Sequence, residues 1–148
     1  MWRLIMIPEK VSNYIKSKGS YILREDKINC IDTIHSLDID LSSEFSSFYQ
    51  EIYCDLISPK PIADLLDIDD IKEQFYYVKD RYDLPDEYIP LTSDESEGMY
   101  LFNKKNGSVY DFNLSEYDTF MKGKISPRWK TFNDFLIWYF DESNVDDI

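Results

Sequence analysis

A hairpin pattern between Met99 and Asn113, MYLFNKKNGSVYDFN, constrains the fold more than any other feature of the sequence. Two runs of strand-forming residues flank a polar stretch that contains Asn106-Gly107. This dipeptide favours tight hairpin turns because both residues tolerate a positive φ. The pattern therefore predicts two antiparallel strands, at Met99–Phe102 and Ser108–Phe112.

A third strand is expected before this hairpin. From Leu84 onward, short apolar runs alternate with turn-forming clusters, a texture typical of an antiparallel meander. The run Tyr88–Leu91 is the predicted strand. Pro90 lacks a backbone N–H, so this strand should lie at an edge of the sheet or at a bulge.

Aromatic residues alternate along the predicted hairpin. Tyr100 and Phe102 share one face of the first strand, and Tyr110 and Phe112 share one face of the second. We expect aromatic pairs to stack across the two strands. On this interpretation the hairpin is core scaffold and carries no chemistry.

Helical periodicity marks the segments on either side of the sheet. The predicted helices run from Pro8 to Gly19, within residues 29–37, over 40–56 with Ser42 or Ser43 as the cap, over 67–85, and over 131–142 with Thr131 as the cap. Helices, an antiparallel meander and a closing C-terminal helix define an α+β fold. Because no linker divides the chain, we predict a single domain over residues 1–148, with an acidic tail that frays from about residue 141.

Acidic side chains outnumber basic ones by 29 to 16, which gives a formal charge of −13. Such a charge repels nucleic acid and anionic membranes, and it accelerates encounter with basic proteins. The sequence therefore predicts a protein partner, with no nucleic acid and no membrane. A role in solubility alone is the simpler alternative. Hydrophobic residues at 43% and aromatic residues at 16% suffice for a folded core despite the charge.

Groups that catalysis or metal binding requires are scarce. The chain has one histidine, His35, expected on the exposed side of a short helix, and it lacks a GxSxG nucleophile motif. Cys30 and Cys54 have no CxxC spacing and are expected to be reduced and half-buried, with their separation left open. We predict that the protein is not an enzyme and holds no cofactor or metal. A hydrolase with paired carboxylates is the weaker alternative, because no acid and base pair can be placed with the required geometry.

The first ten residues, MWRLIMIPEK, bear on localisation. Their apolar run is too short for the hydrophobic region of a signal peptide and far too short to span a bilayer. A cytoplasmic location is therefore expected.

Acidic residues concentrate in three places along the chain. One group lies in or just before the first turn of the helix predicted at 67–85, a second lies in or just after its last turns, and a third lies in the turn before the hairpin. These groups are Asp64, Asp67, Asp69 and Asp70; Asp80, Asp83, Asp86 and Glu87; and Asp94, Glu95 and Glu97. The third group lacks the ligand order and loop length of an EF-hand, so a solvated turn is favoured over a metal site.

The first two acidic groups flank one helix and predict one negative surface, although the first group also suits a helix start by itself. Tyr76 and Tyr77 are neighbours on this helix and cannot share a face, so one should point outward as an aromatic anchor. The predicted partner-binding residues are Asp67, Asp69, Asp70, Tyr76, Asp83, Asp86 and Glu87, with Asp94, Glu95 and Glu97 as the second choice.

The order of these segments resembles the SUKH superfamily, also called the SMI1/KNR4 family. The resemblance rests on short motifs in the C-terminal half: Ile89-Pro90-Leu91, Glu97-Gly98, Tyr100-Leu101-Phe102, Gly107-Ser108-Val109-Tyr110 and Thr131-Phe132-Asn133-Asp134-Phe135-Leu136. Around the helix at 45–53 the chain departs from the family pattern. It has Ser42-Ser43 where the family usually has proline, and Asp55-Leu56-Ile57 in place of a glycine-containing turn.

The resemblance implies a function. Most members of this superfamily are bacterial immunity proteins that bind and neutralise toxins deployed in interbacterial competition, often nucleases, and eukaryotic relatives act as regulatory adaptors. It implies an immunity protein that occludes the active site of a cognate toxin, a basic nuclease-type domain, with an acidic surface. A regulatory adaptor that binds another cellular protein is the alternative. The oligomeric state is left open.

Overall fold

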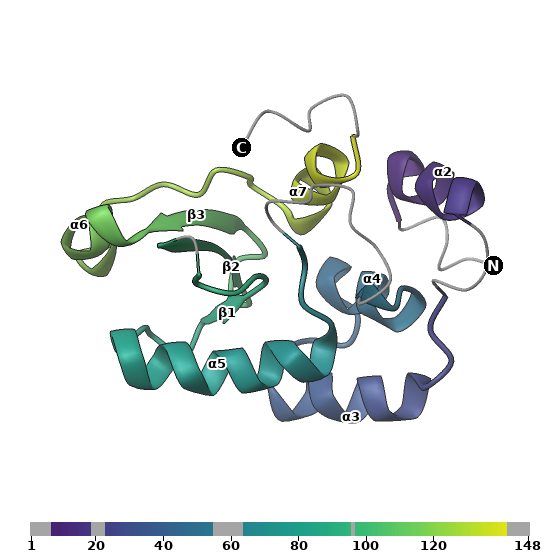
Figure 1. Ribbon diagram of the computed structural model, residues 1–148, viewed down its shortest axis with the longest axis horizontal. Coiled ribbons are helices and arrows are strands. Elements are labelled where there is room, and N and C mark those ends of the chain that lie inside the picture. The colour runs from purple at the N-terminus through teal and green to yellow at the C-terminus, as the bar shows by residue number, and fades with distance from the viewer. Residues whose placement is uncertain (1–6, 19–22, 55–63, 96, 142–148) are drawn as a thin grey trace.

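The computed structural model describes residues 7–18, 23–54, 64–95 and 97–141 (Figure 1). The elements run in the order α2 (Glu9–Lys18), α3 (Lys27–Ser36), α4 (Glu44–Glu51), α5 (Ile68–Tyr82), β1 (Tyr88–Pro90), β2 (Gly98–Asn103), β3 (Val109–Asn113), the 3-10 helix η3 (Leu114–Glu116), α6 (Tyr117–Met121) and α7 (Phe132–Tyr139). α5 lies along one side of the sheet, and α3 lies beside α5. The helices α4, α7 and α2 lie toward one end of the sheet (Figure 1). The α+β prediction is confirmed.

The sheet is the predicted meander. Its strand order is β1-β2-β3 with both pairs antiparallel, so β1, which contains Pro90, is an edge strand as expected. The hairpin turns at Gly107, whose φ is 79°, and the Asn103 N–H donates to the Ser108 carbonyl at 2.8 Å. A glycine suits this position because other side chains rarely adopt a positive φ.

The predicted stacking of aromatic pairs across the hairpin is wrong. In the observed register, Tyr100 lies opposite Asp111, whereas Phe112 lies opposite Met99. Directly opposed residues share a face, so Tyr100 and Phe102 point to one side of the sheet, and Tyr110 and Phe112 point to the other. A shift of one residue in register exchanges the two faces, and the sequence pattern alone did not fix it.

Each face of the sheet instead has its own aromatic core. On one face, Phe102 stacks on Phe45 of α4, with ring centroids 4.8 Å apart, and meets Phe132 of α7 at 5.5 Å. On the other, Phe112 contacts Phe120 of α6 at 5.0 Å, beside the buried Val78 of α5. A sheet covered on both faces leaves little of its surface free for a partner, which moves the search for a binding surface to the helices.

Two predicted helix caps are confirmed. The Ser43 hydroxyl accepts from the Ser46 N–H at 3.2 Å, and the Thr131 hydroxyl accepts from the Asp134 N–H at 3.0 Å. α4 ends at Glu51, earlier than predicted. η3 and α6 were not predicted, because eight residues are too few to establish a helical period, yet they carry Phe120 into the second core.

The N-terminal helix α2 packs against the C-terminal end of the described chain. Tyr14 of α2 meets Phe140 after α7, with ring centroids 5.0 Å apart, and Lys10 pairs with Asp141 at 2.9 Å. Cys30 and Cys54 are free thiols and fully buried, deeper than the half-burial expected. Within the described ranges, no helix has the length and apolar character to cross a membrane. The predicted extent of the domain stays a prediction, and the fraying tail beyond residue 141 lies outside the described residues.

Candidate protein-binding surface

α5 divides into a buried side and an exposed side. Its buried side consists of Ile68, Ile71, Phe75 and Val78, spaced three and four residues apart as a helix packed on a core requires. At 1.5 Å per residue its 15 residues span roughly 22 Å. The opposite side is therefore a long surface held in place by the core beneath it.

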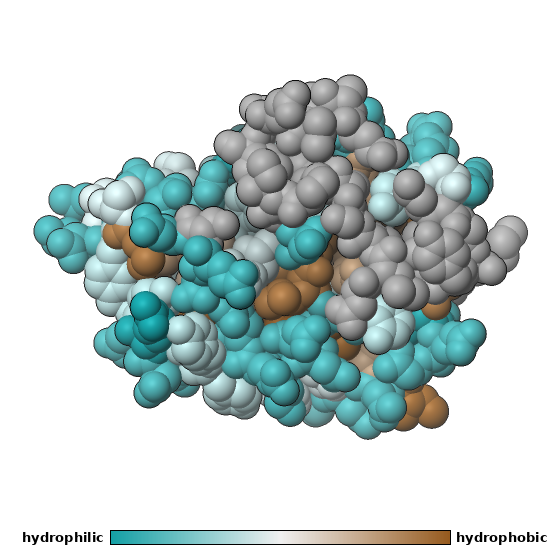
Figure 2. All heavy atoms as spheres, in the orientation of Figure 1, coloured by the Kyte–Doolittle hydropathy of each residue, from teal (hydrophilic) through white to brown (hydrophobic). Residues whose placement is uncertain are grey.

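The exposed side carries a row of acidic residues, and the basic Lys79 and Arg81 are exposed in its last turn. Asp69, Glu73 and Asp80 follow one another at spacings of four and seven residues, which places their side chains in one row. Tyr76 and Tyr77 flank this row, with 55% and 46% of their surface exposed. We call the exposed acidic and tyrosine residues of this side the acidic face: Asp69, Asp70, Glu73, Tyr76, Tyr77 and Asp80. Figure 2 shows hydrophilic residues over α5, interrupted by residues of intermediate hydropathy.

The carboxylates of the acidic face lack basic partners. Among the described residues, no ion pair involves Asp70, Glu73 or Asp80, and Asp69 accepts a hydrogen bond only from the Thr33 hydroxyl, at 3.2 Å. Partial burial, together with the charges of Glu73, Asp67 and Asp69, raises the pKa of Asp70. Like charges three and four residues apart destabilise a helix, so this row has an energetic cost.

Asp67 does not belong to this surface, and its prediction as a partner contact is corrected. It is 6% exposed, and its Oδ1 accepts from the Arg24 guanidinium and, at 3.0 Å, from the Cys54 N–H. Arg24 also donates to the carbonyls of Tyr49 and Ile52, at 2.5 and 3.2 Å. The carboxylate therefore fastens the start of α5 to the end of α4.

The acidic residues after α5 divide between solvent and protein. Asp83 ends the helix in a left-handed conformation and is exposed. Asp86 pairs with Lys79 at 2.6 Å, and this hydrogen bond raises the pKa of Lys79 and lowers that of Asp86. Glu87 accepts from the Asn103 side chain at 2.8 Å and lies 3.9 Å from Lys105. Glu87 thus holds the hairpin tip, and its role as a free partner contact is not supported by this geometry.

The turn before β2 is partly structural. Asp94 accepts from the Tyr82 hydroxyl at 2.5 Å and from the Gln74 side chain at 3.2 Å, which fastens this turn to the last turns of α5. Burial, followed by this hydrogen bond to Asp94, raises the pKa of Tyr82. Glu95 and Glu97 are exposed. Across the described part of the chain, no three His, Cys, Asp or Glu residues are grouped to hold a metal ion.

Two acidic residues of the acidic face, Glu73 and Asp80, are absent from the predicted partner-binding residues. Asp80 belongs to the second acidic group of the sequence, and Glu73 belongs to none of the three groups. The spacing of four residues from Asp69 to Glu73, and of seven from Glu73 to Asp80, is the signal that identifies both. The expectation that one of Tyr76 and Tyr77 points outward was too narrow, because both are exposed.

α3 extends the surface beside α5. The hydrogen bond from Thr33 to Asp69 joins the two helices, which lie next to each other in Figure 1. Ile28, in the first turn of α3, is 77% exposed, and His35 is exposed as predicted. An exposed isoleucine on the helix next to α5 adds apolar area of the kind that protein interfaces bury.

Comparisons with known proteins agree with this arrangement. The model of the SMI1/KNR4 family (SUKH-1) matches residues 25–138 of the 148-residue chain. This range contains α3 through the greater part of α7, and hence the whole acidic face. No curated protein and no solved structure matches the chain significantly.

Proposed function

Because the chain belongs to the SMI1/KNR4 family (SUKH-1), we propose that it is an immunity protein that neutralises a cognate toxin by binding it. In this proposal, the acidic face covers the active-site region of a basic toxin domain of the nuclease type. The protein acts in the cytoplasm of the cell that it protects. It works by occlusion and makes or breaks no bonds.

The observation that carries the proposal is the row of unpaired carboxylates on α5. Glu73 lies four residues after Asp69 and three after Asp70, so these carboxylates repel one another, and no ion pair within the described ranges relieves them. A protein selected for stability alone would gain from a lysine in place of Glu73. The arrangement is accounted for if a basic partner supplies the missing charges.

Fixation at both ends prepares α5 for binding. Asp67 holds its start through Arg24, and Asp94 holds its end through Tyr82. The spacing of the carboxylates is therefore set before a partner arrives. Pre-organised surfaces lose less conformational freedom on association, so more of the contact energy appears as affinity.

The composition of the acidic face indicates which chemical groups its partner presents. A nuclease groove that binds phosphates presents several lysine and arginine side chains, and a row of carboxylates satisfies the same groups. Tyr76 and Tyr77 offer flat, partly polar rings between the charges, a residue type enriched at binding hot spots. The exposed Asp83 continues the negative surface beyond the helix, whereas the charge of Asp86 is compensated by Lys79.

The decisive experiment is coexpression. The protein is produced with the C-terminal domain of a secreted toxin encoded beside its gene, and growth and complex formation are measured. We expect growth to be rescued and the two proteins to elute together in gel filtration. If the toxin domain kills and neither result is obtained, the immunity function is wrong, and the regulatory adaptor of the same family becomes the better explanation.

A further inference from the structure

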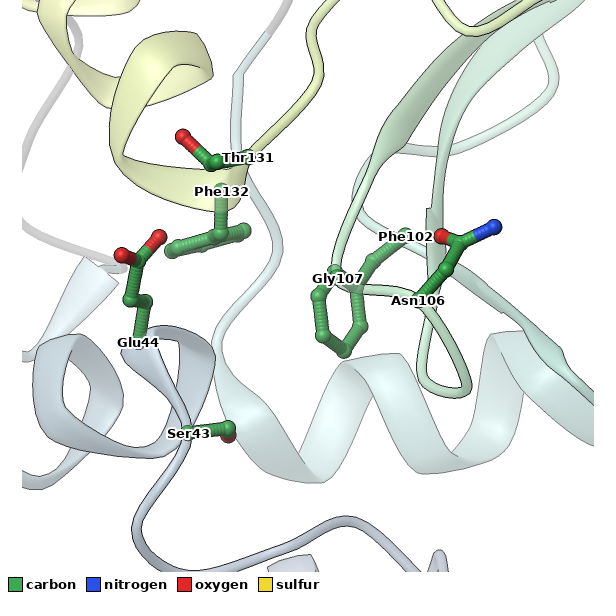
Figure 3. A pocket seen from close by; sticks show the side chains of 7 residues that line it. All are labelled: Ser43, Glu44, Phe102, Asn106, Gly107, Thr131 and Phe132. Carbon is green, nitrogen blue, oxygen red and sulfur yellow. The ribbon is translucent and has the colours of Figure 1, made fainter.

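A pocket lies where three chain segments meet, apart from the residues of the acidic face. Its volume is about 200 Å³. It is enclosed by the first residues of α4, the first residues of α7 and the tip of the β2–β3 hairpin (Figure 3). The lining residues are Ser43, Glu44, Phe102, Asn106, Gly107, Thr131 and Phe132.

The interior of the pocket is aromatic. The rings of Phe102 and Phe132 are almost fully buried and meet edge to face, with centroids 5.5 Å apart and an angle of 79° between their planes. At Gly107, an added Cβ would meet no atom within 4 Å, so the hairpin tip leaves the space beside it open. The base of the pocket is thus fixed and aromatic, and a small part of it is accessible to a partner side chain.

Glu44 is the charged residue among those that line the pocket. Its Oε1 accepts from the Asn133 N–H at 3.0 Å, which draws the carboxylate from α4 toward the start of α7 (Figure 3). A carboxylate has roughly four acceptor positions, and this hydrogen bond uses one of them. Glu44 is therefore both oriented and able to accept further hydrogen bonds.

The partial positive charges at the N-termini of α4 and α7 do not make the pocket positively charged. Each helix N-terminus carries about half a positive charge. Glu44 and Asp134 place a full negative charge in the first turns of α4 and α7, and the capping hydroxyls of Ser43 and Thr131 satisfy one backbone N–H in each helix. Among the residues that line the pocket, Glu44 carries a full negative charge, which exceeds the half charge of the helix end beside it, so a cationic group is favoured over an anion.

We propose that this pocket binds an arginine side chain of the protein partner. The three methylene groups of arginine would lie against Phe102 and Phe132, and its guanidinium would donate to the Glu44 carboxylate, an arrangement that suits a planar cation beside aromatic rings. The volume is smaller than the 300–1,000 Å³ typical of small-molecule sites, which matches a single side chain. The proposal depends on the proposed function only for the existence of a basic partner, and its chemistry can be tested without that partner.

Three small probes test the pocket by NMR on the full-length ¹⁵N-labelled protein. They are the N-acetyl methylamides of arginine, of citrulline, which has nearly the same shape without the charge, and of norleucine, which is apolar. We expect the arginine probe to shift the amide signals of Glu44, Gly107 and Asn133 in a saturable manner. The citrulline probe should bind about tenfold more weakly, since a hydrogen bond to a charged group contributes on the order of 1.4 kcal/mol or more.

A matched variant isolates the carboxylate. Glu44→Gln keeps an oxygen that accepts from the Asn133 N–H, so the fold is preserved, but it removes the charge. We expect it to eliminate the preference for arginine over citrulline, whereas Glu116→Gln, at an exposed site on η3, should leave that preference unchanged. Equal binding of arginine and citrulline, tighter binding of norleucine, or signal shifts outside the pocket would each overturn the proposal. None of these results bears on the coexpression experiment, so the two proposals fail separately.

Discussion

Arg24 and Asp67 form an ion pair inside the protein, with side chains that are 0% and 8% exposed. Arg24 precedes α3 and Asp67 precedes α5, so the pair connects two segments that lie 43 residues apart. Arg24 also occupies the carbonyls at the end of α4. One guanidinium therefore joins three helices at the base of the acidic face.

Replacing Arg24 should be severely destabilising. Arg24→Met leaves the Asp67 carboxylate buried without its partner, and we expect a loss of about 3–5 kcal/mol in the free energy of unfolding. Urea denaturation followed by circular dichroism measures this loss. The double variant Arg24→Met, Asp67→Leu removes both charges and should recover part of it. A loss below about 1 kcal/mol in the single variant would contradict the structural role assigned to the pair.

Charge reversal on the acidic face should slow binding. The triple variant Asp69→Lys, Glu73→Lys, Asp80→Lys should lower the association rate with the cognate toxin domain by at least about tenfold at low ionic strength. It should also flatten the dependence of that rate on salt, because the steering charges are gone. Stopped-flow kinetics at several salt concentrations measures both effects.

A second triple variant controls for net charge. Glu9→Lys, Glu116→Lys, Asp118→Lys changes exposed residues on α2, η3 and α6, none of which belongs to the acidic face. Each reversal adds two units of charge, so both triple variants carry −7 where the natural chain carries −13. If the two variants slow association equally, overall charge is sufficient and the acidic face has no special role.

Glu73 should show opposite effects on stability and on binding. It lies four residues after Asp69 and three after Asp70, so Glu73→Gln relieves repulsion along the helix and should raise the free energy of unfolding by about 0.2–0.5 kcal/mol. The same change should weaken toxin binding, as measured by isothermal titration calorimetry. A gain in stability with no loss of affinity would show that the carboxylate serves solubility alone.

Asp70 should make the stability of the protein depend on pH in a defined direction. Its folded-state pKa is raised, chiefly by partial burial, so its charge opposes folding above that pKa. The penalty is complete above the folded-state pKa and disappears as the pH falls through it toward the unfolded value, about 3.9. Asp70→Asn should therefore raise the melting temperature at pH 7 and have little effect near pH 3. A thermal shift independent of pH would contradict this assignment.

Gly98 should be sensitive to the smallest enlargement. An added Cβ would lie 2.6 Å from the backbone oxygen of Phe112 on the neighbouring strand, so one strand must move. We expect Gly98→Ala to reduce the free energy of unfolding by about 1–3 kcal/mol. Chemical denaturation measures the change, with Ser126→Ala at an exposed position as the control. An unchanged free energy of unfolding would mean that β3 can move away from Gly98 at no energetic cost.

Local chemistry made several parts of this fold predictable. The dipeptide Asn106-Gly107 identified the hairpin, Ser43 and Thr131 identified two helix starts, and Pro90 identified the edge strand. Each of these signals depends on the backbone preferences of one or two residues. These local preferences are observed in the structure because the tertiary contacts around them favour the same backbone conformations.

The candidate site was harder to predict because the contacts that decide which of its residues are free join segments that are distant in the sequence. Nothing near Asp67 in sequence marks it as buried, since its partner Arg24 comes from a distant segment. Likewise Asp94 is engaged by Tyr82 and Glu87 by Asn103, across turns whose closure only the fold defines. The helical spacing of Asp69 and Glu73, by contrast, is local and can be read from the sequence alone.

The buried side of α5 carries residues that stabilise the fold, and its exposed side carries the residues assigned to partner binding. Ile71 and Phe75 face inward and Glu73 faces outward, whereas the exposed Tyr76 ring contacts Phe75, with centroids 5.2 Å apart. Substitutions of the outward carboxylates should therefore accumulate with little harm to folding. A lineage can then adjust its specificity by single steps as its opponent mutates, while the scaffold beneath is inherited unaltered.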